Sequence, residues 1–215
     1  MANSARDNIL AAVKSALSGS RLPSAVKPDL MSSLYVREKD KDPVLVFAEN
    51  FVSRKADFFY SESMEEFQQQ ITAYLAERNF RSVHIWEKEL AEELSSCHIQ
   101  FETGERNLPS IDCGITLCEC IIERTGSIMV SSRQSAGRRL SIYPPVHIVV
   151  ASVGQLLPDI KDGLAFIKKK YGQRLPSMIS LITGPSRTAD IEKTLVMGAH
   201  GPKELILFLI DDATA

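Results

Sequence analysis

The sequence predicts an α/β protein with three layers, α/β/α, built around a mostly parallel sheet. Short, continuously apolar runs such as VLVFA, VHIVVAS and LILFLI are typical of strands that are buried on both faces. Stretches with apolar residues at helical spacing alternate with these runs along the chain. With 215 residues, the chain is long enough to bury a sizeable core without disulfides or a structural metal.

The N-terminal segment is expected to form a helix and a linker outside the α/β domain. Ala5 to Leu17 carries its apolar side chains on one side of a helix, and a stretch rich in Ser and Pro follows it. We therefore assign residues 1–40 to an amphipathic helix with its linker, and residues 41–215 to the α/β domain. The helix packs either on its own domain or on a neighbouring subunit.

The first part of the α/β domain is predicted to hold two strands and a helix. The run VLVFA after Pro43 is expected to be a buried strand. A helix is predicted over Met64 to Arg78, with Ser61 and Ser63 before it as candidate caps. The run from Ser82 to Trp86 reads as a second strand.

The middle of the domain combines apolar runs with a polar loop. Ile111 to Val130 is expected to form one or two strands, interrupted near Gly114 and Gly126. The polar loop SSRQSAGRRL follows, and the run VHIVVAS after it is predicted to be a buried strand. The loop either clamps an anion or closes as a lid, or it is a solvated surface loop. Its three arginines are Arg133, Arg138 and Arg139.

The last part of the domain is expected to return to alternating helices and strands. A helix is predicted over Leu156 to Tyr171, with Gly172 as its C-cap. Met178 to Ile182 reads as a strand. The segment TGPSRTADIEKTLVMG is expected to begin as a turn and continue as a helix, before LILFLI closes the chain as a buried strand.

The segment TGPSRTAD holds the first group of candidate ligand-binding residues. Ligands of parallel sheets bind where loops beyond the carboxyl ends of strands meet helix N-termini. A helix start leaves backbone N–H groups unpaired and carries partial positive charge, so an adjacent arginine would complete an anion site. The alternative is that the small oxygen-bearing residues only cap the helix. The candidates here are Gly184, Ser186, Arg187, Thr188 and Asp190.

Two further segments are candidates for the same site. His200 and Gly201, in GAHGP before the last strand, offer a proton carrier or hydrogen-bond donor, although a lone loop histidine also serves structural roles. Thr125 and Gly126 interrupt an apolar run within ERTGS, either against a ligand or at a strand end that is fixed by a salt bridge.

Composition and charge exclude several classes of protein. With 25 Lys and Arg against 27 Asp and Glu, the chain has no electrostatic reason to bind nucleic acid or an anionic membrane. No apolar window approaches the ~18 residues of a membrane span, and the N-terminus does not resemble a signal peptide, so we expect a cytoplasmic protein. The four cysteines lack metal-site spacing and are expected to be free thiols, and no metal site is predicted. Nucleotide-binding, hydrolase and zinc-protease motifs are also missing.

The segments ERTGS, YPPVHIVVAS, TGPSRTADIE and GAHGPKELILFLI, in this order, resemble the LUD-domain lactate-utilization family (LutC/YkgG type). The resemblance covers residues 111 to 210 most closely. It implies a fold similar to the NagB/RpiA/CoA-transferase-like superfamily. One position departs from the family pattern, because many members read IAETG where this chain reads IERTG. Arg124 therefore replaces the usual acidic residue and would favour anions at the site.

The resemblance implies a role as a component of a cytosolic system that oxidises L-lactate to pyruvate. The partners would be iron–sulfur oxidoreductase proteins, with the clusters in those partners and no cofactor in this chain. A small carboxylate or phosphate ligand would bind at the three motif segments. The alternative is a stand-alone transferase or ligase of the same superfamily, acting on a CoA ester, a folate or a sugar phosphate. The sequence assigns no catalytic residue.

Overall fold

The computed structural model describes residues 5–19, 41–104, 110–191, 194–198 and 200–211, and it divides the chain into two compact units. The first unit comprises residues 1–38 and holds helix α1 (Ala5–Gly19), which confirms the predicted N-terminal helix. Its apolar side chains Ile9, Leu10 and Val13 are exposed. The second unit comprises residues 39–215 and contains all three sheets of the described residues and the remaining helices.

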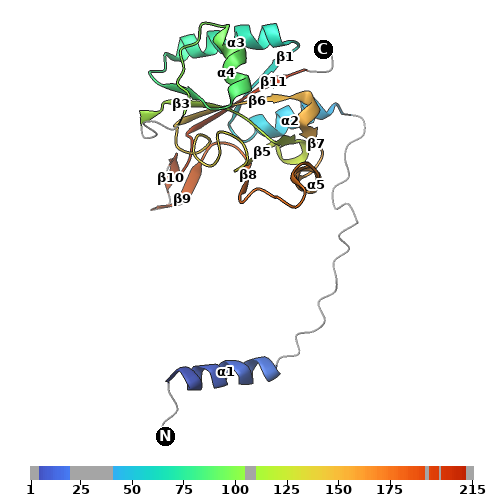
Figure 1. Ribbon diagram of the computed structural model, residues 1–215, viewed down its shortest axis with the longest axis vertical. Coiled ribbons are helices and arrows are strands. Elements are labelled where there is room, and N and C mark those ends of the chain that lie inside the picture. Colours follow the sequence, from blue (N-terminus) through green and yellow to red (C-terminus); the bar gives the residue numbers. More distant parts are fainter. Residues whose placement is uncertain (1–4, 20–40, 105–109, 192–193, 199, 212–215) are drawn as a thin grey trace. The chain divides into compact units, whose positions relative to one another are not determined.

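A five-stranded, fully parallel sheet forms the centre of the second unit, as predicted (Figure 1). The strand order is β1-β11-β6-β3-β2, so the last strand of the chain lies between the first strand and β6. The central strands β6 and β11 are buried along almost their whole length, which explains their uninterrupted apolar sequences. The bounds are β1 Asp57–Ser61, β2 Val83–Ile85, β3 Cys113–Leu117, β6 Val146–Ser152 and β11 Glu204–Ile210.

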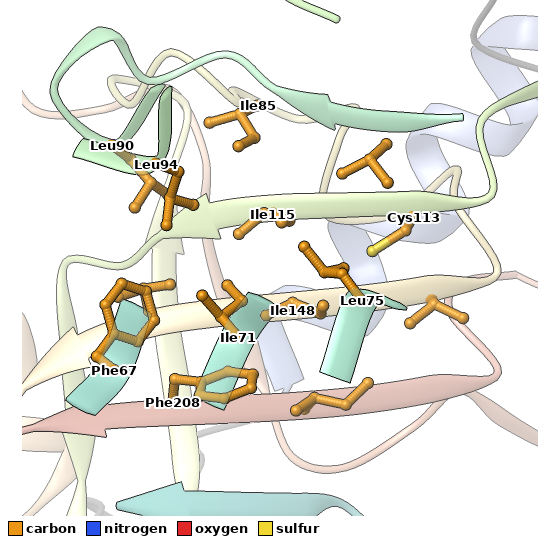
Figure 2. Close-up of a cluster of buried hydrophobic side chains, with 14 of the residues drawn as sticks. Phe67, Ile71, Leu75, Ile85, Leu90, Leu94, Cys113, Ile115, Ile148 and Phe208 are labelled. Atoms are coloured by element: carbon orange, nitrogen blue, oxygen red, sulfur yellow. The ribbon is translucent and has the colours of Figure 1, made fainter. Parts of the chain in front are cut away.

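Helices α3 (Met64–Arg78) and α4 (Lys88–Ser95) cover one face of this sheet (Figure 1). Figure 2 shows their apolar side chains directed onto the strands, where Phe67 and Ile71 lie over Phe208. The helix predicted over Met64–Arg78 is confirmed to the residue, because both its apolar spacing and its cap are local signals.

The opposite face carries helix α2 (Pro43–Val52) and a second, four-stranded sheet of order β7-β4-β5-β8. These elements bury Phe47, Phe51 and Ile128 against the central strands β6 and β11. Helix α5 (Ile160–Tyr171) packs on the second sheet through Ile167. The bounds of the second sheet are β4 Cys120–Ile122, β5 Ser127–Ser131, β7 Leu156–Leu157 and β8 Ile179–Ile182.

The prediction of a strand at VLVFA is wrong, because these residues begin helix α2. The Asp42 side chain accepts a hydrogen bond from the backbone N–H of Val44 at 2.8 Å, and Pro43 occupies the first helical position. Phe47 and Phe51 are buried four residues apart, whereas Leu45 is exposed. The helical period becomes visible only when the run is continued to Phe51.

The prediction of a helix within TGPSRTADIEKTLVMG is also wrong. The described residues of this segment instead form two antiparallel strands, β9 (Arg187–Ile191) and β10 (Thr194–Met197). The segment is rich in the β-branched residues Thr, Ile and Val, which favour strands over helices.

Two other element boundaries differ from the predictions. The helix expected from Leu156 begins at Ile160, because Leu156 and Leu157 pair with β4 and Asp159 caps the helix. Ile111 to Val130 contains three strands, and the predicted interruption near Gly126 is confirmed. No interruption occurs at Gly114, which lies inside β3, where a Cβ atom would meet the Leu140 carbonyl oxygen at 2.8 Å.

The role of Ser63 as the N-cap of α3 can be tested by substitution. The Ser63 hydroxyl accepts a hydrogen bond from the backbone N–H of Glu66 at 3.2 Å. Ser63→Ala is expected to lower the free energy of unfolding by ~1 kcal/mol, measured by urea denaturation, because a helix N–H loses its partner. Ser63→Asp keeps an acceptor and is expected to retain most of the stability. An equal loss in both variants would contradict a capping role.

Within the described residues, no helix is both long enough and apolar enough to cross a membrane.

Candidate functional site

The segments predicted to bind a ligand meet around the last turn of α2. A Cβ atom on Gly126 would lie 2.4 Å from the backbone nitrogen of Phe51, and one on Gly184 would lie 2.9 Å from the carbonyl oxygen of Arg54. The Arg187 guanidinium donates a hydrogen bond to that same Arg54 carbonyl. The convergence that the sequence predicted is therefore present, and the end of α2 lies at its centre.

The candidate segment with His200 and Gly201 contacts this group through Ser186. The Ser186 N–H donates to the Pro202 carbonyl oxygen at 2.8 Å, and the Gly198 N–H donates to the Ser186 carbonyl oxygen at 3.0 Å. A Cβ atom on Gly201 would lie 3.2 Å from that of Ser186, and His200 beside it is exposed. We call residues 125–126, 184–187, 198 and 200–202 the motif cluster.

The motif cluster lies at the amino edge of the parallel sheet, and not at the carboxyl edge as expected. Residues 200–202 lie just before β11, and the Lys203 N–H donates to the carbonyl oxygen of Pro145, which directly precedes β6. The segment with Gly184 follows β8, a strand of the second sheet.

Arg187 and the residues after it lie in a strand, so the expected helix start, with its unpaired N–H groups, is absent from this described segment. The side chains of Thr188 and Asp190 lie outside the described residues. The Oγ1 atom of Thr125 is buried without a hydrogen-bond partner. That the motif residues bind a ligand stays a prediction.

Arg124, the residue that departs from the family pattern, forms a salt bridge with the N-cap of α5. Its Nε and Nη2 atoms donate to the two Asp159 carboxylate oxygens at 3.0 and 2.9 Å. This pairing lowers the pKa of Asp159, with the Arg124 hydrogen bond as the main cause. A salt bridge at this strand end is therefore present, as one of the two interpretations of ERTGS expected, and ligand contact of Thr125 and Gly126 stays a prediction.

The carboxyl edge of the sheet holds a polar cavity of about 460 Å³. We call it the polar cavity. Segments that directly follow β2, β3, β5 and β6 contribute its walls, together with the end of α5. This is the location where open parallel sheets generally bind ligands. The lining residues are Glu87, Lys88, Glu89, Leu117, Cys118, Arg133, Gln134, Ser135, Gln155, Lys170 and Tyr171.

A buried carboxylate organises one wall of the polar cavity. Glu119 accepts hydrogen bonds from Ser131 at 2.5 Å, Tyr171 at 2.7 Å and Lys170 at 2.8 Å. Burial alone would raise the pKa of Glu119, but these three donors lower it more, so that the net pKa lies below its ordinary value. Burial lowers the pKa of Lys170, whereas Glu119 raises it by more, so the ammonium group is fixed in its charged form.

The polar loop after β5 supplies the second cation. Arg133 is exposed, lines the polar cavity and donates from Nη2 to the Arg174 carbonyl oxygen at 3.1 Å. Arg138 is also exposed and donates to the Ser177 hydroxyl at 2.6 Å. The loop is thus a surface loop that places Arg133 at the cavity.

Glu87 is a buried carboxyl group in the lining of the polar cavity. It is buried, with 6 % of its surface exposed, and its Oε1 atom accepts from the Ala136 N–H at 3.3 Å. Its Oε2 atom is buried without a hydrogen-bond partner. Burial raises the pKa of Glu87 above its ordinary value, and nearby backbone N–H groups offset this only in part. Burial therefore favours the protonated form of the Glu87 carboxyl group.

Sequence reasoning missed Glu87, Glu119, Lys170 and Tyr171, although two of them had a signal. Glu119 lies within the apolar run LCECII, where a charged side chain must be paired if it is buried. Glu87 directly follows a predicted strand, at the carboxyl edge of the sheet.

The cysteines are free thiols, and Cys113, Cys118 and Cys120 are buried. Burial raises the pKa of all three, that of Cys120 to about 12, so these thiols stay protonated. No group of three or more His, Cys, Asp or Glu side chains suited to a metal ion occurs among the residues that the structure describes.

The sequence is similar to several curated proteins. Lactate utilization protein C of Bacillus licheniformis is 34% identical over 114 residues, which cover 51% of this chain and 48% of that protein. Its Bacillus subtilis counterpart is 32% identical over 116 residues, covering 52% and 48%. An uncharacterized protein of Neisseria meningitidis serogroup B is 37% identical over 101 residues, covering 47% and 43%. In each case the chain matches about half of the relative's length.

The fold is similar to that of a solved protein. The crystal structure of a DUF162 family protein from Deinococcus radiodurans matches with a TM-score of 0.60 and 19% identity, covering 78% of this chain and 96% of that one. The model of the LUD domain matches residues 100–210, just over half of the chain. Both findings agree with the resemblance inferred from the motifs, and the chain belongs to the LUD domain family.

Proposed function

We propose that this chain is a LutC-like component of a cytoplasmic system that oxidises L-lactate to pyruvate. The observation that supports this role is the LUD segment, which is shared with proteins named Lactate utilization protein C. The redox chemistry would take place on iron–sulfur clusters of partner proteins. Cys113, Cys118 and Cys120 are buried and burial raises the pKa of each thiol, which supports placing the clusters in the partners.

We further propose that the chain binds a small anionic ligand in the polar cavity. Lys170 lines this cavity, and about half of its side chain is exposed while its Nζ atom stays 2.8 Å from Glu119. Arg133 lines the same cavity, so two cations can contact one carboxylate or phosphate.

Glu87 adds recognition of a neutral polar group. The unpartnered Oε2 atom of Glu87 can accept a hydrogen bond from the hydroxyl group of a 2-hydroxy acid, and the protonated form of the carboxyl group would also donate to the oxo group of a 2-oxo acid. Lactate and pyruvate carry this combination of a carboxylate with an adjacent oxygen function.

Lys170→Ala is expected to weaken binding of L-lactate or pyruvate roughly ten- to hundred-fold, since a hydrogen bond to a charged group contributes ~1.5–3 kcal/mol. Isothermal titration calorimetry measures this change. Lys169→Ala removes a neighbouring exposed lysine that does not line the cavity, and it is expected to leave the affinity unchanged.

Arg187→Ala distinguishes the polar cavity from the motif cluster. If the ligand binds in the polar cavity, this variant keeps its affinity. If Arg187→Ala abolishes binding and Lys170→Ala does not, the ligand belongs to the motif cluster and the proposed site is wrong.

The role in lactate oxidation is tested in cells. The tagged chain is expected to co-purify with a protein that carries iron–sulfur clusters, and its deletion is expected to abolish growth on L-lactate while growth on pyruvate continues. Unchanged growth on lactate, with no cluster-bearing partner recovered, would contradict the role.

A further inference from the structure

A second cavity, of about 300 Å³, lies beside the polar cavity at the carboxyl edge. We call it the apolar cavity, because most of its lining side chains are hydrophobic. Phe67 and Leu90 come from α3 and α4, and Val150 and Ile210 from the ends of β6 and β11. All four are buried, whereas Met64 on its wall is 40% exposed. Sites for small molecules generally occupy ~300–1,000 Å³, so each cavity alone is at the lower end of that range.

The two cavities share part of their walls. Glu89, Leu117 and Gln155 line both of them. Gln155 is fixed at both ends of its amide, because Nε2 donates to the Cys118 carbonyl oxygen at 2.9 Å and Oε1 accepts from the Ser152 N–H at 2.9 Å. The Gln155 part of the shared wall is therefore held in place, with its amide atoms already paired, and the Glu89 side chain lines the wall beside it.

This arrangement defines the shape and polarity of a ligand. The polar cavity offers the cations Lys170, Arg133 and Lys88 together with the buried Glu87, whereas the apolar cavity next to it offers hydrocarbon surface. A molecule with a charged head and a hydrocarbon tail satisfies both compartments. Lactate has only a methyl group to place against the apolar wall.

We propose that the two cavities form one site for a 2-hydroxy or 2-oxo carboxylic acid whose apolar side chain is longer than the methyl group of lactate. This inference rests on the proposed anion site at Lys170. The carboxylate lies between Lys170 and Arg133, the adjacent oxygen faces Glu87, and the side chain lies between Met64 and Val150 in the apolar cavity.

Calorimetric titration with 2-hydroxy acids of increasing length tests this inference, starting from lactate and continuing through 2-hydroxybutyrate, 2-hydroxyvalerate and 2-hydroxyhexanoate. The affinity is expected to rise about four-fold for each added methylene group, the fold-change that corresponds to full burial of each group. Met64→Trp, which fills the apolar cavity, is expected to remove this increase with chain length. Leu45→Trp, at an exposed position on α2 away from both cavities, is the matched control.

The outcomes separate this inference from the proposed function. An affinity that does not depend on chain length in the unmodified protein overturns the inference, while a loss of lactate binding in Lys170→Ala still supports the anion site. If Lys170→Ala binds every acid of the series normally, the anion site and the inference are both wrong. The series in the unmodified protein decides the question even if Met64→Trp does not fold.

Discussion

Gly126→Ala is expected to lower the free energy of unfolding by several kcal/mol. The backbone of Gly126 is left-handed, with a φ of 56°, which costs an alanine ~1–2 kcal/mol. The added Cβ would also lie 2.4 Å from the backbone nitrogen of Phe51 and would displace α2, at a cost of ~1–3 kcal/mol. Equilibrium denaturation in guanidinium chloride measures the combined loss.

Gly137→Ala is the matched control for this prediction. Gly137 has a φ of 57°, but the nearest atom to its added Cβ would be 3.8 Å away. It therefore carries the backbone cost without the clash and is expected to lose only ~1–2 kcal/mol. If the two variants lose the same stability, the turn of the motif cluster does not anchor α2.

Gly126, the glycine of ERTGS, therefore has a structural role. The turn formed by Glu123–Thr125 lies against α2, and the Asn50 side chain donates to the Glu123 carbonyl oxygen at 3.0 Å. Gly126 allows the two backbones to approach this closely. The motif cluster thus joins α2, the β4–β5 turn and the segment before β9.

Glu119→Gln is expected to lower the free energy of unfolding by ~2–3 kcal/mol at pH 7, because a buried carboxylate that accepts three hydrogen bonds loses its charge. The Lys170 side chain is about half exposed, so solvent screening keeps its share small. Urea denaturation measures the loss. Glu92→Gln, which removes only an exposed ion pair with Lys88, is expected to lose less than ~0.5 kcal/mol.

Glu119→Gln is also expected to change how the stability of the protein depends on pH. The folded-state pKa of Glu119 lies below its unfolded value, so its stabilisation is complete above pH ~4.3 and is lost as the pH falls through the folded-state pKa. The unmodified protein is therefore expected to lose stability more steeply than Glu119→Gln in this acidic range. Parallel slopes for the two proteins below pH ~4.3 would show that Glu119 has an ordinary pKa.

Local signals explain which elements the sequence predicts correctly. Helix α3 has a serine cap and apolar residues at regular helical spacing, and both signals lie within its own residues. The buried strands β6 and β11 are recognisable from their unbroken apolar runs. Strand β1 and helix α4 were not predicted. Apolar and polar residues alternate little in β1, and α4 is only eight residues long.

Tertiary context explains the two wrong assignments. VLVFA is apolar enough for a strand, but the cap at Asp42 and the partner Phe51 make it a helix. The segment from Arg187 forms two antiparallel strands, although its Ser, Thr and Asp residues resemble a helix start.

The candidate site depends even more on topology. Glu119 meets Lys170 and Tyr171 only because α5 packs on the second sheet, 51 and 52 residues further along the chain. The order of the strands, which places β3 beside β2 and β6, determines which loops border the polar cavity. A single sequence gives the residue types of these loops but not their neighbours. The motifs, by contrast, are contiguous in sequence and could be recognised directly.

Hydrogen–deuterium exchange of the full chain, with and without saturating L-lactate or 2-hydroxyhexanoate, most directly tests the central claim that the carboxyl edge binds the ligand. We predict that ligand slows exchange in residues 117–119, 131–135 and 167–171 and leaves residues 184–187 and 200–202 unchanged. Slower exchange in the motif cluster, with no change at the carboxyl edge, would contradict the claim.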